Sequence, residues 1–114
     1  MGLVTEQWLF LQDVASLIEF IKTAKEMASG GELWRPDWVE DEYRKQGLSK
    51  TKARNPHGMK LAIDLHFFDS NGKLMDNKEF IAPFADYWKS LSPKNIWGGD
   101  WKDPHDPCHF ERKI

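Results

Sequence analysis

Cysteine is scarce in this sequence, because Cys108 is the only one among 114 residues. An intramolecular disulfide is therefore excluded, and so is a zinc site built from several thiolates. Any metal that this chain binds must be held by histidines and carboxylates.

An excess of positive charge is also missing. Sixteen Lys and Arg stand against 18 Asp and Glu, which gives a net charge of -2. A protein that grips nucleic acid through its phosphates needs a basic surface. We therefore expect no nucleic-acid partner, and the same absence argues against a metal nuclease.

Long hydrophobic runs are absent as well. The longest, residues 8–11, is far shorter than a membrane span, and the first basic residue is Lys22, so the charged start of a signal peptide is missing. We expect no membrane contact and synthesis in the cytoplasm without a signal peptide.

The residues that are present favour one folded domain. Hydrophobic residues make up 40% of the chain and aromatic residues 13%, which is enough for a core. A chain of this length suits one ordinary domain, so we expect a single domain over residues 1–114.

Hydrophobic spacing predicts the elements of this domain. Apolar residues recur at steps of three and four over residues 5–29, which indicates a long helix with Thr5 as N-cap and Gly30 and Gly31 as its stop. We predict a short strand or extended segment at 32–35, a helix at 36–47 and a polar loop at 48–56. A strand at 61–68 with a turn at 69–72, a helix at 80–91 and a weak strand at 109–113 follow.

Pro83 is acceptable only near the first turn of its helix.

Together the predicted helices and strands indicate an α+β fold, in which a small, mainly antiparallel sheet is packed by the long N-terminal helix and shorter helices.

All four histidines lie in the C-terminal half of the chain, among several aspartates. His57 on a loop, Asp64 on the following strand and His109 offer two imidazoles and a carboxylate, the donor set of an open catalytic zinc site. Asp106, three positions before His109, is placed to accept a proton in such a site. Asp103 is the alternative base.

Three segments then carry a family resemblance. Residues 55–65 resemble the S-x-H-x-x-G-x-A-x-D signature of zinc D-alanyl-D-alanine carboxypeptidases and dipeptidases and of phage L-alanyl-D-glutamate endolysins. Residues 97–101 and 106–111 are similar to that family's W-G-G-D-W and D-x-x-H-F-[EQ] segments, and residues 31–35 resemble its arginine-bearing strand. The family belongs to a superfamily with lysostaphin and sonic hedgehog.

The resemblance implies a role for five residues. It makes His57, Asp64 and His109 zinc ligands, Asp106 the catalytic acid or base, and Arg35 the group that binds substrate and polarises its carbonyl.

Two positions depart from the family pattern, since Asn55 replaces Ser and Lys60 replaces Gly.

We expect His66 and His105 to be hydrogen-bonded structural residues and Cys108 to have no role in catalysis or metal binding. Either Trp97 or Trp101 could form a wall of the substrate cleft.

The function that the resemblance implies is zinc-dependent hydrolysis of an amide bond in the peptide stem of bacterial peptidoglycan. The enzyme would be an L-Ala-D-Glu endopeptidase or a D-Ala-D-Ala carboxypeptidase, of the type of a monomeric phage endolysin that reaches the wall after membrane permeabilisation. The alternative is a non-catalytic zinc-containing module of the same fold that binds cell wall or a protein.

Overall fold

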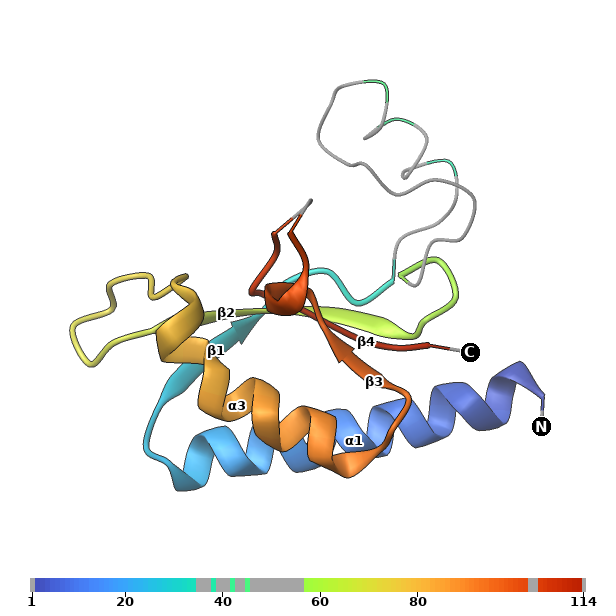
Figure 1. Cartoon of the computed structure of the whole chain (residues 1–114), viewed down its shortest axis with the longest axis horizontal. Helices are drawn as coiled ribbons and strands as arrows, with labels where there is room; N and C mark the ends of the chain where they lie inside the picture. The colour runs from blue at the N-terminus through green and yellow to red at the C-terminus, as the bar shows by residue number, and fades with distance from the viewer. Residues whose placement is uncertain are drawn as a thin grey trace.

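The computed structural model describes residues 2–34, 38, 42, 45, 57–102 and 105–113. The elements in chain order are α1 (Leu3–Thr23), β1 (Met27–Gly30), β2 (Ala62–Phe68), α3 (Lys78–Leu91), β3 (Asn95–Trp97), the 3-10 turn η1 (Gly98–Asp100) and β4 (His109–Arg112). Figure 1 shows α1 and α3 on the same side of the sheet. The fold is α+β, as the sequence predicts.

The four strands form an antiparallel sheet in the order β1-β2-β4-β3. β4 therefore lies between β2 and β3, although it is the last of these strands in the sequence. In this register Asp64 of β2 is directly opposite His109 of β4. Side chains at such paired positions lie on the same face of a sheet.

The two faces of the sheet differ in what they touch. Along β2, Ile63, Leu65 and Phe67 are buried, whereas Asp64 and His66 are only half-buried. Successive strand residues point to opposite faces, and the buried set belongs to the core that α1 and α3 form. Asp64 and His66 therefore project from the face that these helices leave uncovered.

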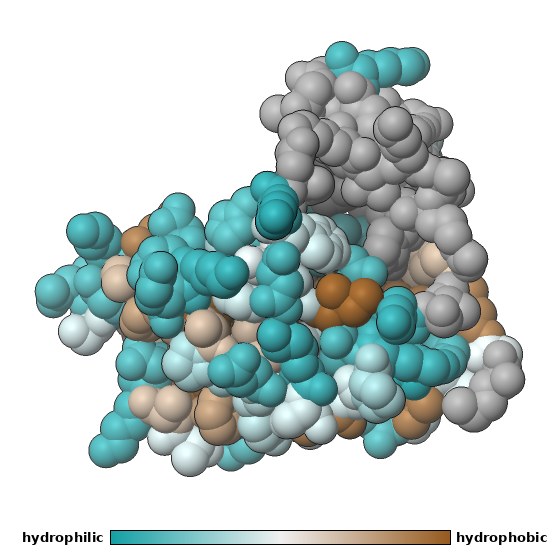
Figure 2. All heavy atoms as spheres, viewed as in Figure 1, coloured by the Kyte–Doolittle hydropathy of each residue, from teal (hydrophilic) through white to brown (hydrophobic). Residues whose placement is uncertain are grey.

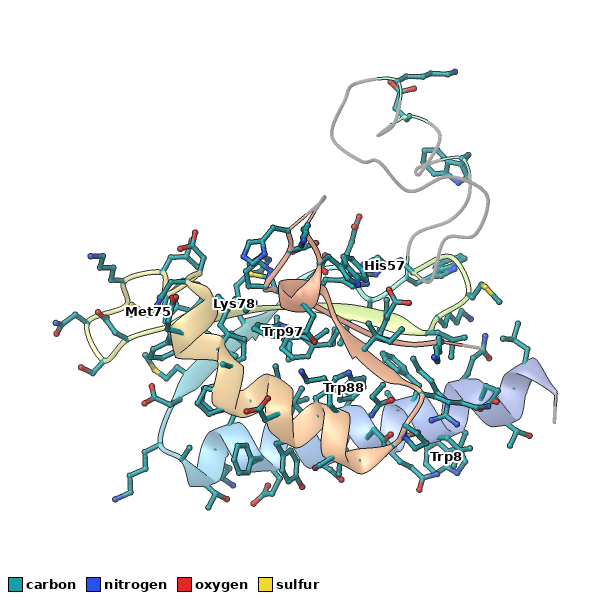
Figure 3. The ribbon with its side chains drawn as sticks, viewed as in Figure 1. Trp8, His57, Met75, Lys78, Trp88 and Trp97 are labelled. Carbon is teal, nitrogen blue, oxygen red and sulfur yellow. The ribbon has the colours of Figure 1, made fainter. Side chains whose placement is uncertain are left out.

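The core contains several aromatic contacts. Trp88 of α3 makes edge-on contacts with Phe10 of α1 and Phe110 of β4, with ring centroids 5.7 and 6.1 Å apart. Figure 3 shows Trp88 and Trp97 between α3 and the sheet, while His57 lies on the other side. Burial of each large apolar side chain contributes about 1.5–3 kcal/mol to the stability of the fold. The core therefore holds α1 and α3 against one face of the sheet.

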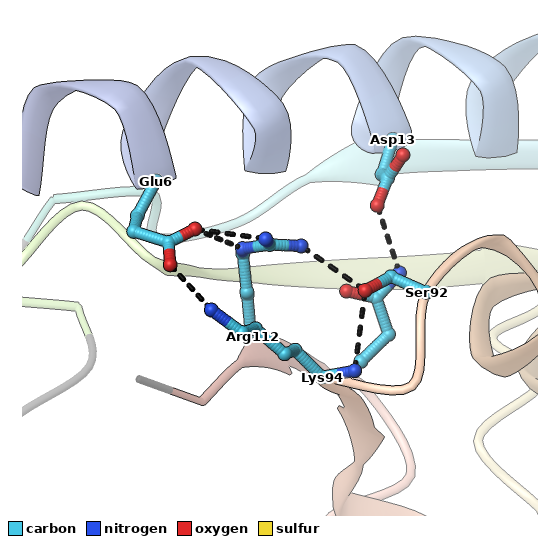
Figure 4. Close-up of polar contacts among 6 residues, drawn as sticks. Glu6, Asp13, Ser92, Lys94 and Arg112 are labelled. Atoms are coloured by element: carbon cyan, nitrogen blue, oxygen red, sulfur yellow. Dashed lines mark hydrogen bonds and ion pairs between the residues drawn. The ribbon is translucent and has the colours of Figure 1, made fainter. Parts of the chain in front are cut away.

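Charged side chains tie α1 to the end of β4. Arg112 donates from Nε and Nη2 to Oε2 of Glu6, at 2.9 and 2.8 Å, and Lys94 donates to the other Glu6 oxygen (Figure 4). The Lys94 and Arg112 hydrogen bonds lower the pKa of the Glu6 carboxyl. Asn95 adds a bond to Asp13, at 3.1 Å.

The predicted boundaries of the first helix were wrong. α1 begins at Leu3 rather than Thr5, Gly2 is its N-cap, and the helix ends at Thr23. Lys25 adopts a left-handed φ of 62°, which turns the chain, and Met27–Gly30 then pair with β2 instead of continuing the helix. Ala28 is exposed, so its small side chain gave the helix little packing to compete with strand hydrogen bonds.

Residues 32–34 of the segment predicted as a short strand or extended segment follow β1 and belong to no strand, and Arg35 lies outside the described residues. The backbone just after β1 still meets β2, because Gly31 donates to the Asp64 carbonyl and Asp64 donates to the Glu32 carbonyl, at 2.7 and 2.9 Å. β2 confirms the strand predicted at 61–68, and β4 confirms the one predicted at 109–113. The turn at 69–72 is confirmed by a Gly72 φ of 80° and by backbone N–H groups that donate to the Asp69 carboxylate.

α3 starts at Lys78, earlier than predicted, so Pro83 lies beyond its first turn rather than near it. The short β3 was not predicted, because three residues are too few to display an alternating pattern. Within the helix predicted at 36–47, the described residues Trp38, Glu42 and Lys45 are helical, and the loop predicted at 48–56 lies outside the described residues.

Hydrophilic side chains dominate the surface seen in Figure 2, with hydrophobic ones in smaller patches. Among the helices of the described part of the chain, none is long and apolar enough to span a membrane.

Candidate metal centre

Three side chains from separate segments converge on the uncovered face of the sheet. His57 opens the turn that precedes β2, Asp64 lies in the middle of β2, and His109 begins β4. One ligand atom from each lies within 4.8 Å of the other two. Both imidazoles are buried, and the carboxylate is partly open to solvent.

The spacing of these atoms suits a shared ion better than direct hydrogen bonds. Asp64 Oδ1 lies 3.5 Å from His57 Nε2 and 3.4 Å from His109 Nδ1, whereas N–H···O bonds are usually about 2.7–3.2 Å long. Two ligand atoms about 2.0–2.1 Å from a tetrahedral zinc lie about 3.3 Å apart. Oδ1 is also buried without a hydrogen-bond partner among the described residues. The donor set therefore fits zinc.

The same three groups are strongly coupled through their charges. Burial alone would raise the pKa of Asp64, but the imidazoles of His109 and His57 hold it well below its usual range. Burial would lower the pKa of His109, yet Asp64 and then Glu111 raise it to about 9. Without a metal, this charge distribution keeps a proton on His109 at neutral pH, which a metal must displace to bind.

Glu111 is a site residue that the sequence reasoning missed. Its Oε1 lies 2.8 Å from His109 Nε2, which leaves the other ring nitrogen, Nδ1, directed at Asp64. Carboxylates commonly orient metal-bound imidazoles in this way. The sequence did contain a signal for this contact. Glu111 is two positions after His109 in a predicted strand, and residues two apart in a strand lie on the same face.

Of the predicted base and the predicted substrate-binding residue, Asp106 and Arg35, only Asp106 is among the described residues. Asp106 is half-buried in the turn that leads into β4, and its carbonyl accepts a hydrogen bond from the His109 N–H at 3.1 Å. Asp103, the alternative base, lies outside the described residues, and so do Arg35 and Asn55.

The two tryptophans of the W-G-G-D-W segment have different surroundings. Trp101 is half-buried, with its ring centroid 5.0 Å from that of His109, so it borders the site. Trp97 belongs to the core, where its indole N–H donates to the Pro107 carbonyl at 2.7 Å. Of the two, Trp101 is the one placed to form a cleft wall.

Lys60 occupies a backbone conformation that favours glycine. Its φ is 59°, and its N–H closes the turn onto the His57 carbonyl at 3.1 Å. This explains why the family signature has Gly at the position. The Lys60 ammonium lies 5.3 Å from the centre of the Trp34 ring, a contact that partly offsets the cost of the left-handed backbone.

The remaining candidates lie beside the centre rather than in it. Burial raises the pKa of the Cys108 thiol to about 11, and the thiol is not among the groups whose ligand atoms converge. His105 is exposed, with Nδ1 3.2 Å from the Trp101 carbonyl oxygen. His66 is half-buried on the same face as Asp64.

The family model described as D-alanyl-D-alanine carboxypeptidase matches residues 49–112, which is more than half of the chain. The chain belongs to this peptidase family. The matched range includes all three converging residues of this carboxypeptidase-family chain, together with Asp106.

A solved structure has a similar fold. The L-Ala D-Glu endopeptidase ChiX of Serratia marcescens superposes with a TM-score of 0.63 at 24% sequence identity, over 77% of this chain and 68% of that one. A comparison with curated proteins found no match.

Proposed function

We propose that this chain is a zinc-dependent peptidase that hydrolyses an amide bond in the peptide stem of bacterial peptidoglycan, and that residues 1–114 act as one domain. The observation that carries the proposal is the convergence of three donor atoms, at distances that suit zinc, in a member of a carboxypeptidase family. A match to the family's sequence signature does not by itself bring these three donor atoms together, so their convergence is separate support for the proposal.

Each residue has a chemical role in this proposal. His57 through Nε2, Asp64 through Oδ1 and His109 through Nδ1 hold the metal, and Glu111 fixes the ring of His109. When bound, zinc supplies Lewis acidity, which polarises a carbonyl and lowers the pKa of water.

Two further residues act on the substrate. Asp106 accepts a proton from the attacking water and passes it to the leaving amine, as a general base and then a general acid. Arg35 binds a substrate carboxylate or the oxygen of the scissile carbonyl, because a guanidinium forms strong charge-assisted hydrogen bonds.

Two bonds are candidates for cleavage. The family model is described by D-Ala-D-Ala carboxypeptidase activity, and the ChiX enzyme by L-Ala-D-Glu endopeptidase activity. We further propose that the chain acts as a monomer of the phage endolysin type and reaches the wall after membrane permeabilisation. Mass spectrometry of digested peptidoglycan identifies the bond cut, and light scattering measures the oligomeric state.

The decisive variant is Asp106→Asn, because Asn keeps the shape of Asp but is a poor proton acceptor. Zinc should remain bound, and kcat should fall about 100-fold to 10,000-fold, with little change in substrate binding. Asp86→Asn, an exposed position on α3, is the matched control and should keep wild-type activity.

Other outcomes separate the alternatives. Wild-type turnover in Asp106→Asn would show that another residue, with Asp103 next in line, is the base. If the wild-type protein carries zinc and binds peptidoglycan but cuts no bond, the non-catalytic binding module replaces the peptidase.

A further inference from the structure

The backbone of Asp106 is bonded on both sides. Its N–H donates to the Gly98 carbonyl at 3.1 Å, and its own carbonyl accepts the His109 N–H at 3.1 Å. The backbone of the proposed base is thus connected to η1 in one direction and to the backbone of His109 in the other. A shift of this backbone would move the Asp106 side chain relative to the metal centre.

The next two carbonyls of the same turn also have partners. The Pro107 carbonyl accepts the Trp97 indole N–H at 2.7 Å, and the Cys108 carbonyl accepts the Leu65 N–H at 2.9 Å. Trp97 is buried, with 2% of its surface exposed. The turn over residues 106–108 is therefore anchored to rigid parts of the sheet rather than left as a free loop.

Gly98 allows the closest of these approaches. A Cβ added at Gly98 would overlap the Asp106 carbonyl oxygen and would lie 3.0 Å from the His109 Cβ. Gly98 is buried, and neither neighbour is a flexible side-chain end that could move aside. A side chain here would have to push the Asp106 backbone away.

We propose that Gly98 and Trp97 are positioning residues that set the carboxylate of Asp106 over the metal centre. This inference rests on the proposed function, because it assigns Gly98 an effect that passes through Asp106. It also gives the W-G-G-D-W segment a specific role, since two of its residues hold the backbone that carries the base.

The first test is Gly98→Ala. We expect about a 100-fold fall in kcat, the usual effect of misplacing a catalytic group by about 1 Å, with KM little changed and about one zinc per chain. The Asp106 amide should also exchange its hydrogen faster in the metal-free variant, while amides of β2 remain protected. Gly30→Ala is the matched control, since a Cβ there has nothing within 4 Å.

A double-mutant cycle separates positioning from a general structural effect. If Gly98 acts through Asp106, adding Gly98→Ala to Asp106→Asn should cause little further loss of kcat. A loss by the same factor in both backgrounds would overturn the proposal.

Trp97→Phe keeps the inference testable if Gly98→Ala does not fold, as loss of zinc binding and of the thermal transition would reveal. This variant retains an aromatic ring but removes the donor to Pro107, so kcat should fall about 10-fold, again only when Asp106 is present. Full activity in both positioning variants, with Asp106→Asn inactive, would refute the positioning role alone. Wild-type turnover in Asp106→Asn would refute the base and this inference together.

Discussion

The imidazole of His109 has both ring nitrogens engaged, because Nδ1 faces Asp64 and Nε2 faces Glu111. The Glu111 carboxylate fixes which nitrogen is available for a metal and increases its basicity. The tautomer and the basicity of this ring therefore depend on Glu111, which is not one of the three converging residues.

Glu111→Gln should weaken zinc binding about 10-fold to 100-fold, the usual cost of losing a carboxylate behind a metal-bound histidine. Competition with a chromophoric chelator measures this affinity. Glu19→Gln, an exposed change on α1, should leave the affinity unchanged. Equal affinity in the wild type and Glu111→Gln would show that Glu111 does not support the site.

Cys108→Ser should keep zinc and activity, because the thiol is protonated and lies outside the converging group. The free energy of unfolding should change by less than about 1 kcal/mol. Zinc content and a thermal melt check both points. Loss of zinc from this variant would place sulfur among the ligands.

At the scale of elements, the sequence predicts best where the local pattern and the tertiary packing agree. β2 combines buried alternation with a strong following turn, so its bounds were nearly right. The residue pattern also placed Asp64 and His109 on strands, and the structure pairs those strands. β1 was mistaken for helix, because its residues bury nothing and only their hydrogen bonds to β2 define them. Local periodicity contains no information about such a partner.

The bond between Glu6 and Arg112 could not be predicted for a related reason. The sequence suggests Glu6 only as an acid in the first turn of a helix, and its partner is 106 positions away. The contact exists because α1 crosses under the end of β4, a packing arrangement that follows from the whole fold.

This contact predicts how stability depends on pH. The folded pKa of Glu6 is lowered, so its contribution is present above the unfolded value near 4.5 and is lost as pH falls below it. Glu6→Gln should therefore lower the melting temperature at neutral pH and reduce the fall in melting temperature on acidification. Melts between pH 3 and pH 7 test this, with Glu19→Gln as control. Parallel profiles for Glu6→Gln and the wild type would contradict the prediction.

For the whole molecule, a metal that binds the folded state alone should stabilise it. At a free zinc concentration 100-fold above the dissociation constant, the stabilisation is about 2.7 kcal/mol. The melting temperature should rise with zinc and fall back with a chelator, and magnesium should have no comparable effect. In His57→Ala the zinc-dependent rise should shrink sharply. A rise of the same size in that variant would place zinc elsewhere.

The position of β4 also determines when the site can exist. This strand follows the other three along the chain, yet it inserts between β2 and β3 and brings His109 opposite Asp64. Until β4 pairs with β2, His109 is not opposite Asp64, and β3 lacks the strand with which it pairs. Pairing between strands so far apart in sequence is slow compared with helix formation. Tight metal affinity should therefore appear only once β4 has paired with β2, so that metal binding would report this step of chain assembly.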